Sequence, residues 1–378
     1  MKIVIAPDSF KESLSAQEVA EAIYEGLYRV WPEHEYVCIP VADGGEGTVQ
    51  ALIDATGGKK ITTDVCGPRG ETVHASYGIL GDGTTAVIEI AEACGLHLVP
   101  KEERDPKSAC SYGVGQLVRH ALDLGIHRLI VGLGGSATND GGVGMLKALG
   151  ARFYRDDGTD ISAGGAGLLE LHRIDISQLE PRLANCEILI ACDVDNPLCG
   201  ELGASAIFGT QKGAHEKDIT ILDKALTLFA QHTMALTGKD ILNAKGAGAA
   251  GGIGAAWLGY TNATLKSGID IVLETVNLKK QLLGASLVIT GEGRIDHQTP
   301  HGKTPMGVAV MAKAFNIPVI AVAGCIGDNY QAVYRCGIDA VFTCLPRAMP
   351  LADALQEAKV NLSNVAENIA RLWQVSHS

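Results

Sequence analysis

The segment KIVIAPDSF, residues 2–10, decides the fold class of this chain. It opens with a short apolar run that stops at Pro7, which is typical of a strand buried in a parallel sheet. The sequence SAQE at residues 15–18 then matches a capping box, and apolar residues recur at helical spacing from Val19 to Val30. A strand followed by an amphipathic helix is the repeating unit of a doubly wound α/β domain.

Strand and helix signals of the same kind return near the end of the chain. We predict buried strands at residues 286–290, 318–323 and 340–344, and helices near 307–314 and 352–373. The middle of the chain differs. Residues 59–90 alternate apolar and polar side chains between glycine-containing turns, which predicts an antiparallel ribbon.

The sequence therefore predicts an α/β protein of two domains. One is a discontinuous parallel-sheet domain, flavodoxin-like or Rossmann-like, built from residues 1–58 and 284–378. The other is a mixed α/β domain inserted at residues 59–283. We expect the active site in the cleft between the two domains, since ligand sites favour domain interfaces.

Composition narrows the function classes. The 378 residues are 47% hydrophobic and 20% charged, as in soluble globular enzymes. A net charge of -12 argues against nucleic acid or an anionic membrane as the partner. The N-terminus resembles a strand entry rather than a signal peptide, and no apolar run reaches the roughly 20 residues of a membrane span, so we expect a cytoplasmic protein. The oligomeric state stays open.

The cysteines predict neither a disulfide framework nor a zinc site. Ten occur, and no two of them form a C-x-x-C pair. Six lie within or beside apolar segments, which predicts buried reduced thiols at Cys38, Cys66, Cys94, Cys192, Cys325 and Cys344.

Four loops combine glycine with acidic residues directly after an apolar run. They are DGGEG at 43–47, GGSATNDGG at 134–142, DVDN at 193–196 and GEGRID at 291–296. In an open α/β sheet, loops at the carboxyl ends of the strands bind ligands. Glycine lets backbone amides approach an anion, and neighbouring carboxylates hold the metal that accompanies a phosphate. The pattern predicts phosphoryl transfer from a nucleotide, with a metal ion that accompanies the phosphates.

The loop at residues 134–142 is the strongest phosphate candidate, although a glycine-rich turn has the same composition. Its glycines and hydroxyls can surround an anion at a helix start. The predicted nucleotide-binding residues are Gly134, Gly135, Ser136, Thr138, Asn139, Asp140 and also Lys212, which stands between two glycines. A P-loop is not predicted, because residues 302–304 have its GKT end but His297 replaces its first glycine.

The same loop supports a second interpretation, an NAD(P)-dependent oxidoreductase that acts on a small hydroxy acid. Gly132, Gly134 and Ala137 match the dinucleotide fingerprint. Asp156 stands close to where a ribose-binding acid is expected. Against this interpretation, residues 139–142 would lie in the first turns of the following helix and weaken it.

Acidic residues after two strands are candidate metal ligands. Asp193 and Asp195 would share one face of an extended segment. Glu292 and Asp296 flank Arg294, whose guanidinium can clamp a carboxylate with two hydrogen bonds. The predicted metal ligands are Asp193, Asp195, Glu292 and Asp296, since Mg²⁺ prefers carboxylate oxygens. One carboxylate of the Asp193 pair could instead accept a proton from a substrate hydroxyl.

Two further loops offer substrate contacts. Lys11 has hydroxyls on either side, among them Ser9, and this group can hold a small carboxylate or a phosphate. Asp43 can cap the helix that follows it, with Glu46 as its capping partner, and can contact a ligand at the same time.

Six motifs resemble those of the bacterial glycerate kinase family, in family order and over nearly the whole chain. They are IAPDSFKESL at 5–14, ADGGEGT at 42–48, GLGGSATNDGG at 132–142, CDVDNPL at 192–198, GTQKGA at 209–214 and TGEGR at 290–294. The resemblance implies a discontinuous flavodoxin-like domain and the transfer of a phosphoryl group from ATP to D-glycerate, giving 2-phosphoglycerate. It supplies the identity of the substrate, which composition and spacing do not give.

With this resemblance, the loops give a working hypothesis for the site. The phosphates of ATP lie on the 134–142 loop, and Lys212 offsets charge on the phosphoryl group. The expected catalytic residues are Asp193, Asp8, Lys11 and Arg294. The expected substrate-binding residues are Ser9, Lys11, Asp43 and Arg294, with Lys11 and Arg294 on the glycerate carboxylate. The sequence leaves open whether Asp8, Asp193 or Asp296 takes the proton, and whether the chain is instead a non-catalytic sugar-acid binding protein.

Overall fold

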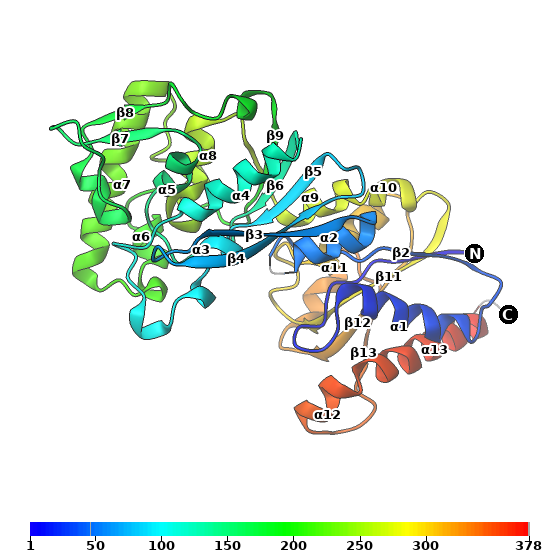
Figure 1. Cartoon of the computed structure of the whole chain (residues 1–378). Coiled ribbons are helices and arrows are strands. Elements are labelled where there is room, and N and C mark those ends of the chain that lie inside the picture. The colour runs from blue at the N-terminus through cyan, green and yellow to red at the C-terminus, as the bar shows by residue number, and fades with distance from the viewer. Residues whose placement is uncertain (46, 377–378) are drawn as a thin grey trace. The chain divides into compact units, whose positions relative to one another are not determined.

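The computed structural model describes residues 1–45 and 47–376 and divides the chain into two units (Figure 1). The discontinuous unit contains Met1–Gly57 and Ser267–Ser378, and the inserted unit contains Gly58–Lys266. Residues 267–283, which the sequence analysis places in the inserted domain, belong with the discontinuous unit. Each unit has its own sheet and its own hydrophobic core.

Five parallel strands form the sheet of the discontinuous unit, in the order β13-β12-β11-β1-β2. They are β1 (Lys2–Ile5), β2 (Glu35–Cys38), β11 (Ala285–Ile295), β12 (Val319–Ile326) and β13 (Ala340–Thr343). Counted within this unit, the order is 2-1-3-4-5, which is the flavodoxin-like order with its switch point between β1 and β11. The predicted flavodoxin-like sheet is therefore confirmed.

Helices α1 (Ala16–Tyr28) and α13 (Ala358–Ser376) lie side by side on one face of this sheet (Figure 1). The predicted capping box is confirmed. The Ser15 hydroxyl accepts a hydrogen bond from the Glu18 amide, and the Glu18 carboxylate accepts one from the Ser15 amide. The remaining helices of the unit are α2 (Thr48–Thr56), α9 (Gly268–Thr275), α10 (Leu278–Gln281), α11 (Thr304–Lys313), α12 (Leu351–Gln356) and the 3₁₀ helix η7 (Tyr330–Cys336).

Two elements differ in length from the prediction. The strand expected at residues 286–290 continues through the GEGRI motif because β12 extends beside it, pairing Arg294 with Cys325. The single helix expected at 352–373 is two helices, since the backbone leaves the helical conformation at Glu357, between α12 and α13.

Gly26 sets how closely α1 and α13 approach. A Cβ atom at this position would lie 2.0 Å from the carbonyl oxygen of Ser363 and 2.8 Å from the Cβ atom of Ala366. We expect Gly26→Ala to destabilise the chain by about 1–3 kcal/mol, because overpacking outweighs a gain in helix propensity of roughly 1 kcal/mol. Thermal unfolding of the variant tests this, and an unchanged or raised Tm would contradict it.

The inserted unit has a six-stranded sheet in the order β10-β9-β6-β5-β4-β3. Its strands are β3 (Lys59–Cys66), β4 (Thr72–Ile79), β5 (Thr85–Glu89), β6 (Arg128–Gly132), β9 (Glu187–Ala191) and β10 (Thr264–Lys266). The pairs β3–β4 and β4–β5 are antiparallel, whereas β5, β6, β9 and β10 run parallel. The ribbon predicted at residues 59–90 is therefore confirmed, and its last strand joins it to the parallel half of the sheet.

A second, two-stranded sheet pairs β7 (Arg152–Tyr154) with β8 (Arg173–Asp175). The α-helices of the inserted unit are α3 (Ala91–Cys94), α4 (Tyr112–Asp123), α5 (Val143–Ala148), α6 (Ala204–Phe208), α7 (Glu216–Thr237) and α8 (Ile253–Tyr260). Its 3₁₀ helices are η1 (Leu96–Leu98), η2 (Lys101–Glu103), η3 (Gly165–Glu170), η4 (Pro181–Asn185), η5 (Thr210–Lys212) and η6 (Ala249–Gly252). Large buried side chains, among them Tyr77, Phe153 and Trp257, fill the core between the sheets and the helices.

The ten cysteines are all free. Of the six predicted to be buried, Cys94 and Cys344 are buried and Cys66 and Cys192 are partly buried. The prediction is wrong for Cys38 and Cys325, which are exposed because they stand at or near the ends of β2 and β12.

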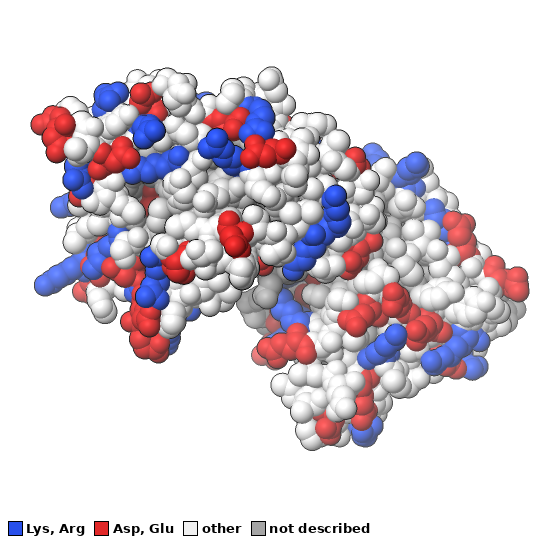
Figure 2. Space-filling model, viewed as in Figure 1, with Lys and Arg blue, Asp and Glu red and all other residues white. Residues whose placement is uncertain are grey.

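Acidic and basic side chains are intermixed on the visible surface of each unit (Figure 2). On this face the acidic side chains are not gathered in one patch, although the whole chain has 43 acidic and 31 basic residues. None of the described helices combines the length and the apolar composition needed to cross a bilayer.

Candidate active site

A cavity of about 550 Å³ opens at the switch point of the discontinuous unit, at the carboxyl ends of its strands. Charged side chains from four segments line it: Asp8 and Lys11 after β1, Asp43 after β2, Glu292 and Arg294 on β11, and Lys303 before α11. Ligand sites of open α/β sheets lie at this place. The cavity is therefore the candidate substrate site of this unit.

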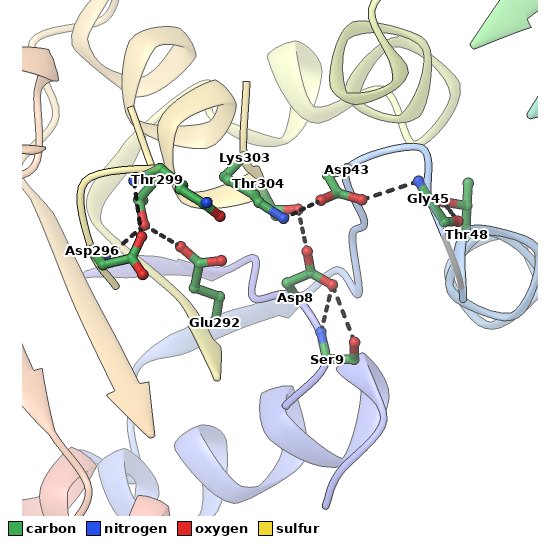
Figure 3. A network of polar contacts seen from close by, with 11 residues as sticks. Asp8, Ser9, Asp43, Gly45, Thr48, Glu292, Asp296, Thr299, Lys303 and Thr304 are labelled. Carbon is green, nitrogen blue, oxygen red and sulfur yellow. Dashed lines mark hydrogen bonds and ion pairs between the residues drawn. The ribbon is translucent and has the colours of Figure 1, made fainter. Parts of the chain in front are cut away.

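Asp8 is held by three hydrogen bonds. Its Oδ1 accepts from the amide (2.7 Å) and the hydroxyl (3.3 Å) of Ser9, and its Oδ2 accepts from the hydroxyl of Thr304 (2.5 Å) (Figure 3). Burial raises the pKa of Asp8 to about 6 despite the hydrogen bond from Thr304, and the negative charge of Asp43 adds to the rise. A carboxylate that titrates near neutrality inside a cavity suits a proton acceptor.

Asp43 forms an ion pair with Lys303, with 3.1 Å between Oδ2 and Nζ, and its Oδ1 accepts a hydrogen bond from the Gly45 amide (Figure 3). Burial alone would raise the pKa of Asp43, but the charge of Lys303 brings it below its ordinary value. Burial tends to lower the pKa of Lys303, but the negative charge of Asp43 opposes it, and the pKa of Lys303 lies above its ordinary value. Each partner therefore keeps the other charged at neutral pH.

The loop that carries Asp43 does not cap α2 as predicted. Gly47 is the N-cap of that helix, and Glu46, the expected capping partner, lies outside the described residues. The loop instead rests on the start of α9. Gly44 has a φ of +95°, and a Cβ atom there would lie 2.4 Å from the Cα atom of Gly268. This backbone contact leaves no room for a side chain, so it fixes the position of Asp43.

The extension of β11 brings Glu292 and Arg294 to the same cavity, since alternate residues of a strand point to one side. The Thr299 hydroxyl donates a hydrogen bond to Glu292 (2.6 Å), and burial raises the pKa of Glu292 to about 7.

Arg294 pairs with Asp296, with 3.0 Å between Nε and Oδ2, while Oδ1 of Asp296 accepts a hydrogen bond from the backbone amide of Gln298 (2.8 Å). Both oxygens of Asp296 are thus engaged, whereas most of the Arg294 side chain is exposed.

Ser9 and Lys11 follow β1, and Lys11 lies in the tight turn at residues 10–14. A backbone hydrogen bond from Phe10 closes the turn, and Glu12 within it has a φ of +64°. Lys11 is exposed and lines the cavity, whereas Ser9 is committed to Asp8. Lys11 is therefore placed to meet an anionic substrate, and Ser9 supports the acid beside it.

The predicted phosphate loop lies in the inserted unit, between β6 and α5. Gly134 and Gly135 are exposed, but the polar side chains that follow are buried: Ser136, Thr138, Asn139 and Asp140. Asp140 holds the turn together, because its carboxylate accepts hydrogen bonds from two backbone amides at the start of α5 and from the amide and hydroxyl of Ser111. The two glycines are thus the part of this loop that faces solvent.

Lys212 is enclosed, with 2% of its surface exposed. Its ammonium donates hydrogen bonds to the Ser136 hydroxyl (2.9 Å) and to the carbonyl oxygen of Thr138 (2.7 Å). Burial lowers the pKa of Lys212 to about 8, although Cys94 and Asp140 oppose this shift. Lys212 therefore braces the glycine loop from inside and brings a positive charge to it.

Asp193 and Asp195 follow β9 and are exposed. They lie beyond the regular strand, so the shared strand face expected for them is not formed, and Asp195 pairs with Lys245 (3.2 Å). Strand β9 is the parallel neighbour of β6. The Asp193 segment and the turn at Gly134 and Gly135 therefore leave adjacent strands at the same edge of the sheet.

A metal ion would depend on few protein ligands here. Among residues 1–45 and 47–376, no group of three or more His, Cys, Asp or Glu side chains is arranged to hold one. Mg²⁺ seldom needs such a cage, because one or two carboxylates and the phosphates of its nucleotide suffice. The exposed Asp193 and Asp195 fit that mode, whereas Asp296 fits it less well because both its oxygens are engaged.

The geometry contradicts the dinucleotide-binding alternative. In a Rossmann domain the fingerprint glycines open directly into a helix, but α5 begins at Val143, well after Ala137. Asp156 follows β7, which belongs to the separate two-stranded sheet, and it lies 3.4 Å from Nε2 of His172. Because β7 is not a neighbour of β6, Asp156 does not take the ribose-binding position beside the fingerprint.

Lys303, Thr304 and Thr299 are site residues that the sequence analysis missed. The signal for the first two is the GKT segment at residues 302–304, which stands directly before an apolar helix. This segment is not the end of a P-loop, because the first glycine of that motif is missing, but it still marks the start of the helix. The sequence does not show that this helix start lies against the end of β1, where Thr304 meets Asp8.

Comparison with known proteins agrees with the geometry. A family model described as the glycerate kinase family matches residues 3–374. A glycerate kinase of Bacillus subtilis (strain 168) is 53% identical over 370 residues, which cover 98% of this chain and 97% of that protein. The glycerate 2-kinase of Escherichia coli (strain K12) is 52% identical over 370 residues, with coverage of 98% and 97%. A crystal structure from Salmonella typhimurium LT2, provisionally assigned as glycerate kinase 2, has a TM-score of 0.93 and 50% identity, covering 100% of this chain and 99% of that one.

Proposed function

The chain belongs to the glycerate kinase family, and on that premise we propose that it transfers a phosphoryl group from ATP to D-glycerate, forming 2-phosphoglycerate and ADP. The observation that carries the proposal is the cavity at the switch point, where Asp8 lies among the cations Lys11, Lys303 and Arg294. Cations suit the carboxylate of a small acid, and a buried carboxylate suits its hydroxyl group.

In the discontinuous unit, Lys11 and Arg294 bind the carboxylate of glycerate. Arg294 is exposed enough to share its guanidinium between Asp296 and the substrate. The C2 hydroxyl then points at Asp8, which accepts its proton while the hydroxyl oxygen bonds to the γ-phosphorus and ADP leaves. Lys303, held by Asp43, offsets the negative charge that gathers in the cavity.

In the inserted unit, the exposed amides of Gly134 and Gly135 bind the phosphates of ATP, and the charge of Lys212 supports them from inside the loop. Asp193, with Asp195 beside it, would hold Mg²⁺ at the neighbouring strand end, where the ion would neutralise charge on the phosphates. The proposal also includes a cytoplasmic location, as expected for an enzyme that draws on ATP.

A coupled ADP-release assay over a set of small hydroxy acids tests the reaction class and the substrate. We expect turnover with D-glycerate, and a ³¹P NMR signal of the product split by the single proton on C2. Splitting by the two protons on C3 would assign the phosphoryl group to the other hydroxyl. Tight binding of glycerate without ADP release would support a binding protein instead, and NADH formation from a hydroxy acid would support an oxidoreductase.

Lys11→Ala should weaken glycerate much more than ATP. The loss of one charge-assisted hydrogen bond predicts a rise of about 10- to 100-fold in KM for glycerate, with KM for ATP changed less than about twofold. Lys313→Ala is the matched control, because Lys313 is a partly exposed lysine of the same unit that pairs with Asp339 outside the cavity. Equal effects of Lys11→Ala on both substrates would contradict the carboxylate role.

A further inference from the structure

Thr304 uses its hydroxyl in an unusual way for the first residue of a helix. A threonine at a helix start commonly bonds to the backbone of its own helix. Thr304 is fully buried at the start of α11, and its hydroxyl donates to Asp8, a residue 296 positions away in the chain. The helix N-cap, Lys303, makes no capping hydrogen bond with its side chain, which is paired with Asp43 instead. The start of α11 is therefore organised around the cavity.

The contact with Thr304 fixes the rotation of the Asp8 carboxylate. Ser9 donates twice to Oδ1, and Thr304 donates to Oδ2. An ionised carboxylate has about four acceptor positions, so these bonds leave capacity for one further donor on a group that lines the cavity. Without the Thr304 bond, only the adjacent Ser9 would orient the carboxylate.

Because Asp8 lies among other charged groups, the hydrogen bond from Thr304 affects whether Asp8 is ionised. The charged side chains that face it or line the same cavity are Lys11 and Glu12 from its own turn, Asp43 from the loop after β2, Glu292, Arg294 and Asp296 from β11 and its end, and Lys303 from the start of α11. Burial, together with the negative charge of Asp43, raises the pKa of Asp8, and the hydrogen bond from Thr304 lowers it.

We propose that Thr304 is a positioning residue for phosphoryl transfer, which holds Asp8 ionised and oriented to accept the proton of the substrate hydroxyl. This inference rests on the proposed function. In the step itself, the substrate O–H bond breaks, its proton passes to Asp8, and the oxygen forms the new bond to phosphorus as the bond to ADP breaks. Thr304 touches neither substrate nor the reacting atoms, and acts only through Asp8.

Thr304→Val tests the inference by the pH dependence of kcat/KM for glycerate, measured at saturating ATP. Valine keeps the shape but removes the donor. We expect kcat/KM to fall about tenfold on its plateau, and its acidic limb to move up by about one pH unit, because a hydrogen bond to an ionised group stabilises that form. The sign follows from the chemistry: Asp8 without this donor holds its proton to a higher pH.

Thr290→Val is the matched control. Thr290 is a fully buried threonine of β11 in the same unit, and its hydroxyl donates to the carbonyl oxygen of Ala6 (2.8 Å) rather than to a carboxylate. We expect this variant to lose stability without moving the acidic limb. Thr304→Ser should restore both the plateau and the position of the limb, because it keeps the hydroxyl.

The outcomes separate this inference from the proposed function. Wild-type protein without glycerate kinase activity would overturn the function. Active wild-type protein with the same pH profile for Thr304→Val and Thr290→Val would overturn the positioning role and leave the function standing. If the valine variant does not fold, Thr304→Cys replaces it, since its thiol is a weak donor and its acidic limb should lie between those of wild type and the expected valine profile.

Discussion

Asp8→Asn should lower kcat for glycerate phosphorylation by about 10²- to 10⁴-fold and make the folded chain more stable at pH 8. Asparagine keeps the shape of the side chain and can still bond to Ser9 and Thr304. It lacks a carboxylate that can take up a proton, so the loss in rate is that expected for a general base. Opposite effects on rate and stability are typical of a functional group held in an unfavourable environment.

The gain in stability follows from the pKa of Asp8. Burial raises this pKa to about 6 in the folded chain, from the ordinary value of 3.8 that applies to the unfolded chain. Between these values the folded state binds more protons, so wild-type stability falls as the pH rises through this window. At pH 8 the ionised group is then destabilising by about 1–3 kcal/mol, and asparagine removes this effect. Near pH 4, where the folded carboxyl is already neutral, the two proteins should differ little.

Steady-state kinetics at pH 8 and urea unfolding at pH 8 and near pH 4 measure both arms of this prediction. Asp54→Asn is the control, because Asp54 is an exposed carboxylate of α2 in the same unit, bonded to Gln50 and not lining the cavity. A variant of Asp8 with near wild-type turnover would remove it as the proton acceptor. A stability difference independent of pH would show that packing rather than ionisation sets the change.

The fold could be predicted wherever a strand is apolar on both faces. Residues 2–6 and 318–323 are central strands of this kind, and the structure has strands at both places. The last part of β11 could not be predicted, because its glycines and charges resemble a loop. It is a strand because β12 lies alongside, so closely that a Cβ atom on Gly291 would be 2.2 Å from the carbonyl oxygen of Val322. That contact joins residues far apart in the chain, so the local sequence contains no pattern that reveals it.

The site could be predicted in part, since Asp8, Lys11, Asp43 and Arg294 all line one cavity. Residues that act through a distant partner could not be predicted, and Thr304 is the main example. The glycine loop shows a different limit. Small polar residues that can surround an anion can equally form hydrogen bonds to the backbone of a turn. The sequence therefore does not reveal that the polar residues at 136–140 are all buried.

Asp193→Asn should lower kcat by at least about 100-fold, because a metal ion contributes several kcal/mol of charge stabilisation to phosphoryl transfer. The residue is exposed beyond the end of β9, so we expect little change in the free energy of unfolding. A ligand role further predicts that the variant needs a higher Mg²⁺ concentration for half-maximal rate. Steady-state kinetics over a Mg²⁺ titration measure both effects.

Two variants sharpen this test. Asp195→Asn removes the adjacent carboxylate, which pairs with Lys245, and a similar rise in the Mg²⁺ requirement would assign both acids to the metal. Asp156→Asn is the control, because Asp156 is exposed in the same unit and is the acid that a dehydrogenase would need for its ribose. We expect it to leave glycerate kinase activity unchanged.

The pH and Mg²⁺ dependences together separate Asp8 from Asp193, two of the three acids among which the sequence leaves the proton acceptor open. If Asp8 takes the proton and Asp193 holds the metal, Asp193→Asn keeps the acidic limb of the pH profile while its Mg²⁺ requirement rises. Asp8→Asn shows the converse, a residual rate without that limb and an unchanged Mg²⁺ requirement. Loss of the limb in Asp193→Asn would instead move the proton acceptor to the inserted unit, and near wild-type turnover at low Mg²⁺ would remove Asp193 from the mechanism.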